Sequence, residues 1–364
     1  MVAGRNRLTA RRVALGVAII AVLGATANAT LDADPGPVRS SRAQAVGAGA
    51  SRVPRRTEGA AVGVDRASAP CGQASASVIA GVDAIAAQGI YAGELHGTEV
   101  KLDVAHITGS RALLSALAMN NEAAVRAAVH AIVYAPRWHI VRLRVTRAGH
   151  VLADVGGPHV IAPVSGELRW RHRIVASYVM SVQDDAGFVK LVGRFIGVPV
   201  DLYTNGSFLM GTLHPAPAFI STGASASVGG ASYVAQVFSA RAFSSDTLRV
   251  ALLVRRPTAK IAAESCAAVR LSAWGAIATR IAGLFKPNLP SHYAELVALL
   301  QSVTGGRAYV RTASTQIAGG AGPSRIPPRG SLRYAGRVWS VLSWEPVPRT
   351  RVYLLTPYVS APYA

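Results

Sequence analysis

The chain has 364 residues, 51% of them hydrophobic, so it can bury a substantial core and form one large or two small domains. Its 38 basic and 18 acidic residues give a formal net charge of +20, and nearly all the basic residues are arginine. This composition excludes a wholly disordered chain, and two cysteines exclude a disulfide-dense scaffold. Only one segment is long and apolar enough to enter a bilayer, which excludes a multi-spanning membrane protein.

Residues 1–29 have the pattern of an export signal. Arginines between positions 5 and 12 precede the apolar run 13–24, and Ala27-Asn28-Ala29 supplies the small residues that a signal peptidase requires. The apolar core is shorter than the roughly 20 residues of a membrane span, which favours a cleaved signal peptide. An uncleaved membrane anchor is the alternative. Either interpretation predicts a secreted or membrane-anchored protein on the extracytoplasmic face.

Residues 30–70 are rich in proline, alanine and arginine and show neither helical nor strand periodicity, which predicts a disordered linker. The periodic part of the chain starts at Cys71, and the second cysteine is Cys266. In an oxidising compartment, two cysteines most simply form one disulfide. Two buried free thiols are the alternative.

Helical periodicity comes first in the folded part. Apolar residues recur at steps of three and four from position 71 to about 108, which predicts one long helix. A second helical stretch is predicted over residues 111–134. Asn120-Asn121 can break it, because either asparagine can cap the helix that follows.

The period then changes to two. Residues 139–146 alternate, and residues 151–155 return after a turn, which predicts a β-hairpin. A second hairpin is predicted from residues 166–170 and 175–182. Asp184 or Asp185 can cap a helix that ends at residue 196. Antiparallel strands with helices gathered on one side predict an α+β domain.

This order of elements resembles an extracytoplasmic PAS-like sensor domain of the single Cache type, the kind found in citrate- and dicarboxylate-sensing histidine kinases. The matching segments are residues 104–108, 112–117, 121–133 and 140–153, then Gly166, Val179 and Gly211. The resemblance covers roughly residues 75–215. It departs where the family usually has His-Pro after the second hairpin strand, because residues 154–158 read Asp-Val-Gly-Gly-Pro here.

The resemblance implies a PAS/Cache-like domain over residues 71–257, with a long N-terminal helix packed on an antiparallel sheet and a small bound ligand. No kinase, HAMP domain or second membrane span follows in this sequence. A separate membrane signalling partner is therefore expected to carry the output.

The second half of the chain repeats part of the first. Residues 191–204 and 299–312 match in their hydrophobic, glycine and threonine positions at one constant offset, and they end near Gly211 and Gly319. Residues 247–253 likewise parallel residues 349–355. These matches predict that residues 258–364 form a second, related α/β unit, with chance similarity as the alternative.

Signatures of catalysis are missing from the sequence: there is no P-loop, no G-x-S-x-G, no HExxH and no EF-hand loop. The nine histidines do not cluster, so no metal site and no cofactor are predicted. Asp184-Asp185 is better explained by helix capping than by acid–base chemistry. A secreted hydrolase is therefore only the third hypothesis.

Arginines carry the leading hypothesis for a site. Arg142 and Arg144 share one face of a predicted strand whose other face must be core, and two guanidiniums suit a carboxylate or phosphate. His159 and Lys190 are weaker ligand-binding candidates from the surrounding segments, and His139 is weaker still. The sequence therefore predicts a sensor-like or solute-binding protein for a small anionic ligand. The alternative is a solvated charged face.

A rival hypothesis comes from the C-terminal part. From residue 301 onward every basic residue is arginine and the only acid is Glu345, with Tyr309, Tyr334 and Trp339 among the interleaved aromatic residues. Nucleic acid would attract such a pattern, but an exported protein rarely meets it. The alternative function is therefore an envelope-associated structural or interaction protein that binds an anionic cell-envelope polymer, and no nucleic acid is expected as a partner.

Overall fold

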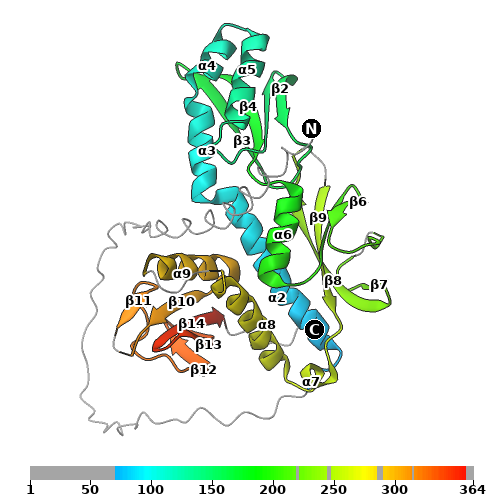
Figure 1. The fold of residues 1–364 in the computed structure, drawn as a ribbon, viewed down its shortest axis with the longest axis vertical. Helices are drawn as coiled ribbons and strands as arrows, with labels where there is room; N and C mark the ends of the chain where they lie inside the picture. The colour runs from blue at the N-terminus through cyan, green and yellow to red at the C-terminus, as the bar shows by residue number, and fades with distance from the viewer. Residues whose placement is uncertain (1–69, 219–220, 244–246, 285–289, 314, 358–364) are drawn as a thin grey trace, which may run out of the picture.

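The computed structural model describes residues 70–218, 221–243, 247–284, 290–313 and 315–357 (Figure 1). These residues form a mixed α/β structure with three antiparallel sheets, which confirms the predicted class of helices with antiparallel strands. Residues 1–29, predicted as a signal peptide or anchor, lie outside the described residues, and so does the predicted linker up to residue 69. Both assignments stay predictions.

Sheet I is the four-stranded sheet, with the order β2-β1-β4-β3. Three helices cover one face of it, and its open face is described below. The elements are α3 (Thr98–Gly109), α4 (Arg111–Ala118), α5 (Glu122–Val133), β1 (Arg142–Arg147), β2 (His150–Gly156), β3 (Pro163–Trp170) and β4 (Arg173–Ser181). Both predicted hairpins are therefore present, and they pair through β1 and β4.

Sheet II has five strands in the order β6-β5-β9-β8-β7 and follows helix α6. Its elements are α6 (Asp185–Ile196), β5 (Val200–Thr204), β6 (Ser207–Gly211), β7 (Ser225–Val228), β8 (Ala231–Arg241) and β9 (Thr247–Arg255). Asp184 caps α6, since its side chain accepts a hydrogen bond from the amide of Gly187. Asp185 has a different role: it is buried and accepts from the amides of Val160 and Ile161 at 3.0 and 2.9 Å.

Sheet III has five strands in the order β11-β10-β14-β13-β12 and follows helix α9. Its elements and the helices before them are α7 (Ala259–Ala262), α8 (Cys266–Ala282), α9 (Pro290–Thr304), β10 (Arg307–Arg311), β11 (Gln316–Ala318), β12 (Arg329–Tyr334), β13 (Arg337–Val347) and β14 (Thr350–Pro357). Counted from the first strand of each sheet, sheets II and III have the same strand order, as a repeated unit requires.

The cross-strand pairs of these two sheets also coincide. In sheet II, Val200 lies opposite Leu252. In sheet III, the residues at the aligned positions, Ala308 and Leu354, lie opposite each other. The aligned glycines behave alike too. A Cβ at Gly211 would lie 1.9 Å from Asp201 Oδ1, and one at Gly319 would lie 2.4 Å from the Ala308 carbonyl oxygen, so neither position can hold a side chain without rearrangement.

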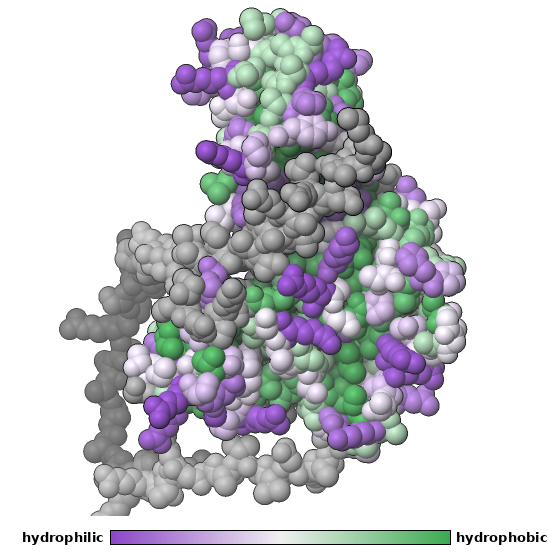
Figure 2. Space-filling view, viewed as in Figure 1, coloured by the Kyte–Doolittle hydropathy of each residue, from purple (hydrophilic) through white to green (hydrophobic). Residues whose placement is uncertain are grey.

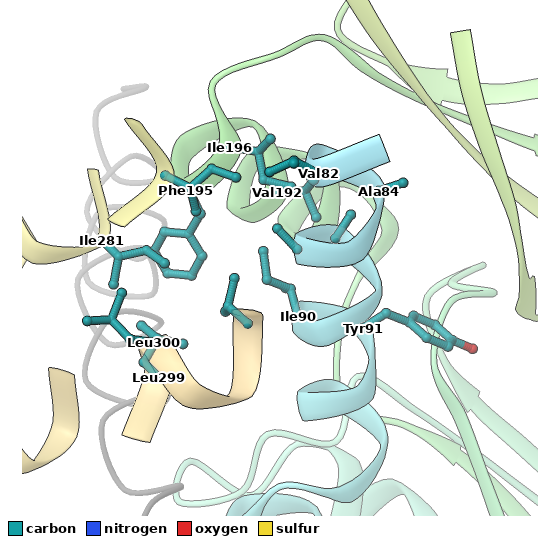
Figure 3. Close-up of a cluster of buried hydrophobic side chains, with 14 of the residues drawn as sticks. Val82, Ala84, Ile90, Tyr91, Val192, Phe195, Ile196, Ile281, Leu299 and Leu300 are labelled. Carbon is teal, nitrogen blue, oxygen red and sulfur yellow. The ribbon is translucent and has the colours of Figure 1, made fainter. Parts of the chain in front are cut away.

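One large hydrophobic core joins sheets II and III. Helices α2 (Ala74–His96), α6, α8 and α9 lie between the two sheets, and their apolar side chains meet there (Figures 1 and 3). Helix α2 approaches α9 so closely at Gly89 that an added Cβ would lie 2.7 Å from the Ser302 carbonyl oxygen. The core therefore contains side chains from both sides of residue 257, where the sequence predicts a domain boundary.

A second, separate core lies between sheet I and helices α3, α4 and α5. The buried face of β1 contributes Leu143 and Val145, which are both fully inaccessible to solvent. Of the two asparagines that the sequence offers as a cap, Asn121 caps α5, since its side-chain oxygen accepts a hydrogen bond from the amide of Ala124 at 3.0 Å.

The predicted single helix over residues 71–108 is wrong in one respect. It consists of two helices, α2 and α3, separated at Gly97, whose backbone is extended (φ −61°, ψ 168°). Glycine has a low helix propensity, so an interruption costs least at such a position. Together these helices are long and apolar enough to span a membrane by length and composition alone, but half of the most apolar window is buried inside the protein.

The predicted disulfide between Cys71 and Cys266 is confirmed. Their Cα atoms are 4.7 Å apart and the Sγ atoms are bonded at 2.05 Å. Pro70 pairs with Ser265, and the Cys71 amide donates to the Glu264 carbonyl at 2.7 Å. The bridge therefore joins the N-terminal ends of α2 and α8, the helices that precede the two halves of the repeat.

Candidate functional site

The candidate site lies on the face of sheet I that points away from its helices. Arg142 and Arg144 alternate along β1 with the buried Leu143, so the geometry of the strand places both guanidiniums on the opposite face. The Arg142 side chain is 16% exposed and that of Arg144 is 28% exposed. Neither arginine extends into open solvent.

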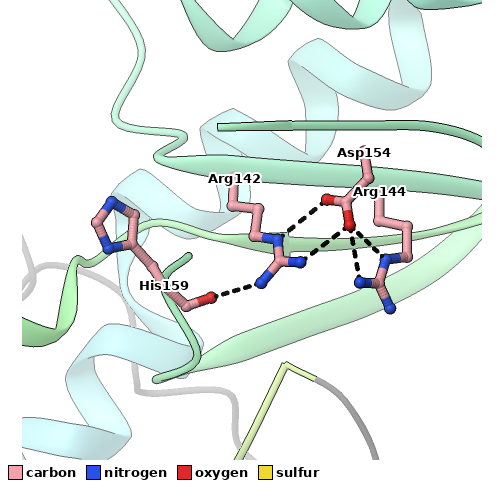
Figure 4. A network of polar contacts seen from close by, with 4 residues as sticks. All are labelled: Arg142, Arg144, Asp154 and His159. Carbon is pink, nitrogen blue, oxygen red and sulfur yellow. Dashed lines mark hydrogen bonds and ion pairs between the residues drawn. The ribbon is translucent and has the colours of Figure 1, made fainter. Parts of the chain in front are cut away.

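Both arginines bind one carboxylate, that of Asp154 on β2 (Figure 4). Arg142 donates to it from Nε at 3.0 Å and Nη2 at 2.9 Å, and Arg144 donates from Nε at 2.9 Å and Nη2 at 2.7 Å. Partial burial alone would raise the pKa of Asp154. The hydrogen bonds and charges of the two arginines outweigh that effect and hold this pKa below its ordinary value.

Two further contacts connect the arginines to other parts of the chain. Arg142 Nη1 donates to the carbonyl of His159 at 3.1 Å. The buried ring of Phe243 lies against both guanidiniums, with its centroid 4.1 Å from Arg142 Cζ and 5.2 Å from Arg144 Cζ. Phe243 follows β8 of sheet II, and Ile161 pairs with Ala242 beside it. The site therefore lies where sheet I meets sheet II.

The structure brings together three of the four predicted ligand-binding residues. Arg142, Arg144 and His159 form one cluster, although His159 contributes its main-chain carbonyl and its ring points elsewhere (Figure 4). Lys190 lies exposed on α6, outside this cluster. The sequence interpretation missed Asp154 and Phe243. Regular pairing of the predicted hairpin from its turn would place Asp154 opposite Leu143, and only the register shift between Val145 and Thr146 brings it opposite Arg144. No local signal points to Phe243.

The charges in the cluster do not balance. Two guanidiniums share a single carboxylate, which leaves an excess of one positive charge. Among the described residues, Arg144 Nη1 has no hydrogen-bond acceptor, whereas Nε and Nη2 both bind Asp154. Arginine presents its donors in a fixed planar fork that matches carboxylate and phosphate oxygens. The cluster can therefore accept a second anionic group.

A second polar cluster surrounds His139, the weakest of the sequence candidates. His139 Nε2 lies 3.7 Å from Glu99 Oε2 on α3. Burial raises the pKa of Glu99 to about 7, and the charge of Asp103 adds to this effect. Burial also raises the pKa of Asp103 to about 6 and lowers the pKa of His139. The net charge of the cluster formed by Glu99, Asp103 and His139 therefore changes near neutral pH.

Within the described ranges, no three histidine, cysteine or acidic side chains are grouped so that they could hold a metal ion. Comparisons with protein-family models, with curated proteins and with solved structures find no match to this chain. The proposals that follow therefore stand on the residues and geometry given above.

Proposed function

We propose that this protein is an extracytoplasmic, sensor-like or solute-binding protein, and that the Arg142–Arg144 cluster binds the carboxylate or phosphate of a small anionic ligand. One observation carries this proposal: two arginines, backed by the buried Phe243, share only one carboxylate and keep an excess positive charge. An anion that binds Arg144 gains a charge-assisted hydrogen bond in a partly desolvated setting, where such bonds are strong.

The position of the cluster suits a sensor. Ligand binding would change the contacts among β1, the segment at His159 and the chain after β8, so it would bias how sheet I sits on sheet II. The resemblance to Cache domains is a second argument for the same proposal, although helix α2 contacts sheet II and not sheet I. The Tyr91 hydroxyl on α2 accepts from the Arg241 amide at 2.7 Å and donates to the Arg241 carbonyl at 3.3 Å. A separate membrane protein would carry the signal onward.

Isothermal titration of the purified protein with succinate, citrate and inorganic phosphate tests the proposal. Replacing both arginines, Arg142→Gln with Arg144→Gln, should weaken the tightest of these interactions about 100-fold, which corresponds to about 2.8 kcal/mol. Arg144→Gln alone leaves Arg142 paired with Asp154 and should cost about tenfold.

The matched control is Arg126→Gln with Arg169→Gln. It removes the same charge from two exposed arginines that pair with Glu122 and Glu167. It should leave the affinity within about threefold of the wild type, because exposed pairs contribute little. Unchanged binding in the Arg142/Arg144 variant, or an equal loss in the control, would refute the site.

A further inference from the structure

A second arginine site lies on sheet III, far from Arg142 in sequence. Ala308 and Val310 of β10 face the large core, so Arg307 lies on the outer face of the sheet. Its Cζ atom is 5.3 Å from the ring centroid of Tyr334 and 5.7 Å from that of Trp339. The arginine is half-buried. Within the part of the chain that the structure describes, its guanidinium contacts no carboxylate and no hydrogen-bond acceptor.

The two rings are held in place before any ligand arrives. Trp339 is only 6% exposed, and its indole Nε1 donates to the Tyr334 carbonyl at 3.0 Å. Trp339 also packs with the buried Val341 and Leu355 in a small cluster on this face. Both rings lie within range of cation–π attraction to the Arg307 guanidinium. The planar fork of N–H groups on that guanidinium remains available for hydrogen bonding.

Arg142 and Arg144 share the carboxylate of Asp154, whereas Arg307 has no carboxylate partner among the described residues. A partly desolvated cation without hydrogen-bond acceptors is costly, and two aromatic rings offset only part of that cost. Glu345 is the only acidic residue after position 300, and it is already engaged by the Arg349 amide and by Arg351, whose Nη2 lies 3.4 Å from it. An oxyanion at Arg307 would supply the missing acceptor.

A second arginine, Arg337, lies beside this position. Arg337 lies directly opposite Tyr334 in the β12–β13 pair, so it lies next to the same ring. It is exposed. Arg329 and Arg333 on β12 are exposed too, but they lie opposite Leu342 and Val338, so they belong to the other face of the sheet. Figure 2 shows hydrophilic residues at the lower left of the molecule, where sheet III lies. A single small anion would satisfy Arg307 alone, whereas a chain of regularly spaced anions would also engage Arg337.

We infer that the outer face of sheet III binds a linear anionic polymer, and that one of its carboxylate or phosphate groups docks on Arg307 above Tyr334 and Trp339. Arg337, on the same face beside Tyr334, holds a neighbouring anionic group. This site is independent of the Arg142–Arg144 cluster, which belongs to sheet I, and either site can exist without the other.

The test is ¹⁹F NMR of the protein labelled with 5-fluorotryptophan, with the Trp339 resonance assigned from Trp339→Phe. Polyphosphate and poly-L-glutamate should each shift this resonance, and the tighter of the two identifies phosphate or carboxylate as the preferred group. Arg307→Gln should abolish the shift and weaken the polymer affinity about tenfold. Arg307→Lys keeps the charge but loses the planar fork, and it should restore only part of the affinity.

The matched control is Arg329→Gln, which removes the same charge from an exposed position on the same sheet. It should change the affinity less than threefold and leave the Trp339 shift in place. Equal losses in Arg307→Gln and Arg329→Gln would overturn the site and leave only general surface charge. If inorganic phosphate bound as tightly as polyphosphate, the proposal that the ligand is a polymer would be wrong. Unchanged resonances of the other tryptophans verify that each variant is folded.

Discussion

Sheets II and III have the same strand order and equivalent inner faces, but their outer faces differ. At the aligned inner positions, Leu252 and Leu354 are both fully buried and face the same core. Helices α2, α6, α8 and α9 fill the space between the two sheets, so a hydrophobic residue is needed at each of these positions. The shared core therefore constrains both inner faces in the same way.

The outer faces are free of that constraint. Where sheet II has Asp201, sheet III has Tyr309, which packs with Trp339 in the cluster that supports Arg307. Tyr203 aligns with Arg311, yet both anchor the segment that follows the second strand. Tyr203 donates to the Pro217 carbonyl at 3.0 Å, and Arg311 Nη1 donates to the Ser324 carbonyl at 3.1 Å. A repeated scaffold can thus keep its packing while one copy acquires a basic, aromatic outer face.

Removing the disulfide should have the largest effect on this paired arrangement, because the bridge fastens the helix that precedes one half of the repeat to the helix that precedes the other. Cys71 and Cys266 are 195 residues apart. Closing so long a loop contributes up to about 5 kcal/mol in the chain-entropy model, and about 2–4 kcal/mol is typical. Cys71→Ser with Cys266→Ser should lower the free energy of unfolding by that amount in urea denaturation. A loss below about 1 kcal/mol would show that packing alone joins α2 to α8.

Truncating one matched side chain on the inner face of each sheet should have the next largest effect on stability. Leu252→Ala and Leu354→Ala each remove a fully buried side chain from aligned positions, and each should lower the free energy of unfolding by about 3 kcal/mol. Because both face one core, a single cooperative transition is expected in each variant. Two separate transitions, or a loss confined to one variant, would show that sheets II and III unfold independently and are not equivalent.

The smallest expected effect concerns pH and the outer face of sheet II. Asp201 is fully buried, and burial raises its pKa above the ordinary 3.8, against the hydrogen bonds from the Leu213 and Thr212 amides that lower it. The folded state therefore holds this proton more tightly than the unfolded state. The stability that Asp201 contributes is complete below the ordinary pKa and is lost as pH rises through the folded pKa. Asp201→Asn should flatten that decline, by about 1 kcal/mol or less.

Asp154 supplies the control of opposite sign, because its pKa is lowered by Arg142 and Arg144. Its contribution is present above the ordinary pKa and is lost as pH falls through the folded pKa. Asp154→Asn should therefore change the acid side of the stability profile and leave the decline in stability that Asp201 causes at higher pH as it is in the wild type. Unfolding by guanidinium chloride between pH 3 and 8 separates the two cases. Identical profiles for the two variants would contradict both assignments.

The sequence by itself determined the local structure and the repeat. Alternation over residues 139–155 placed Leu143 in a core and Arg142 and Arg144 on the other face, because strand geometry dictates it. Short-range rules reduced each helix cap to two adjacent residues, and the structure shows that Asn121 and Asp184 are the caps. The offset between the two halves predicted equivalent strands, and two cysteines in a chain with the pattern of an export signal predicted the bridge.

Only the tertiary structure decided which distant residues meet. The single core between sheets II and III, the break at Gly97, the ring of Phe243 beneath Arg142 and the two rings beneath Arg307 were all absent from the sequence interpretation. Periodicity and capping depend on neighbours a few positions away, whereas Phe243 reaches Arg142 across about one hundred residues. Such contacts arise when whole elements pack to bury apolar area, and no local pattern encodes which elements those are.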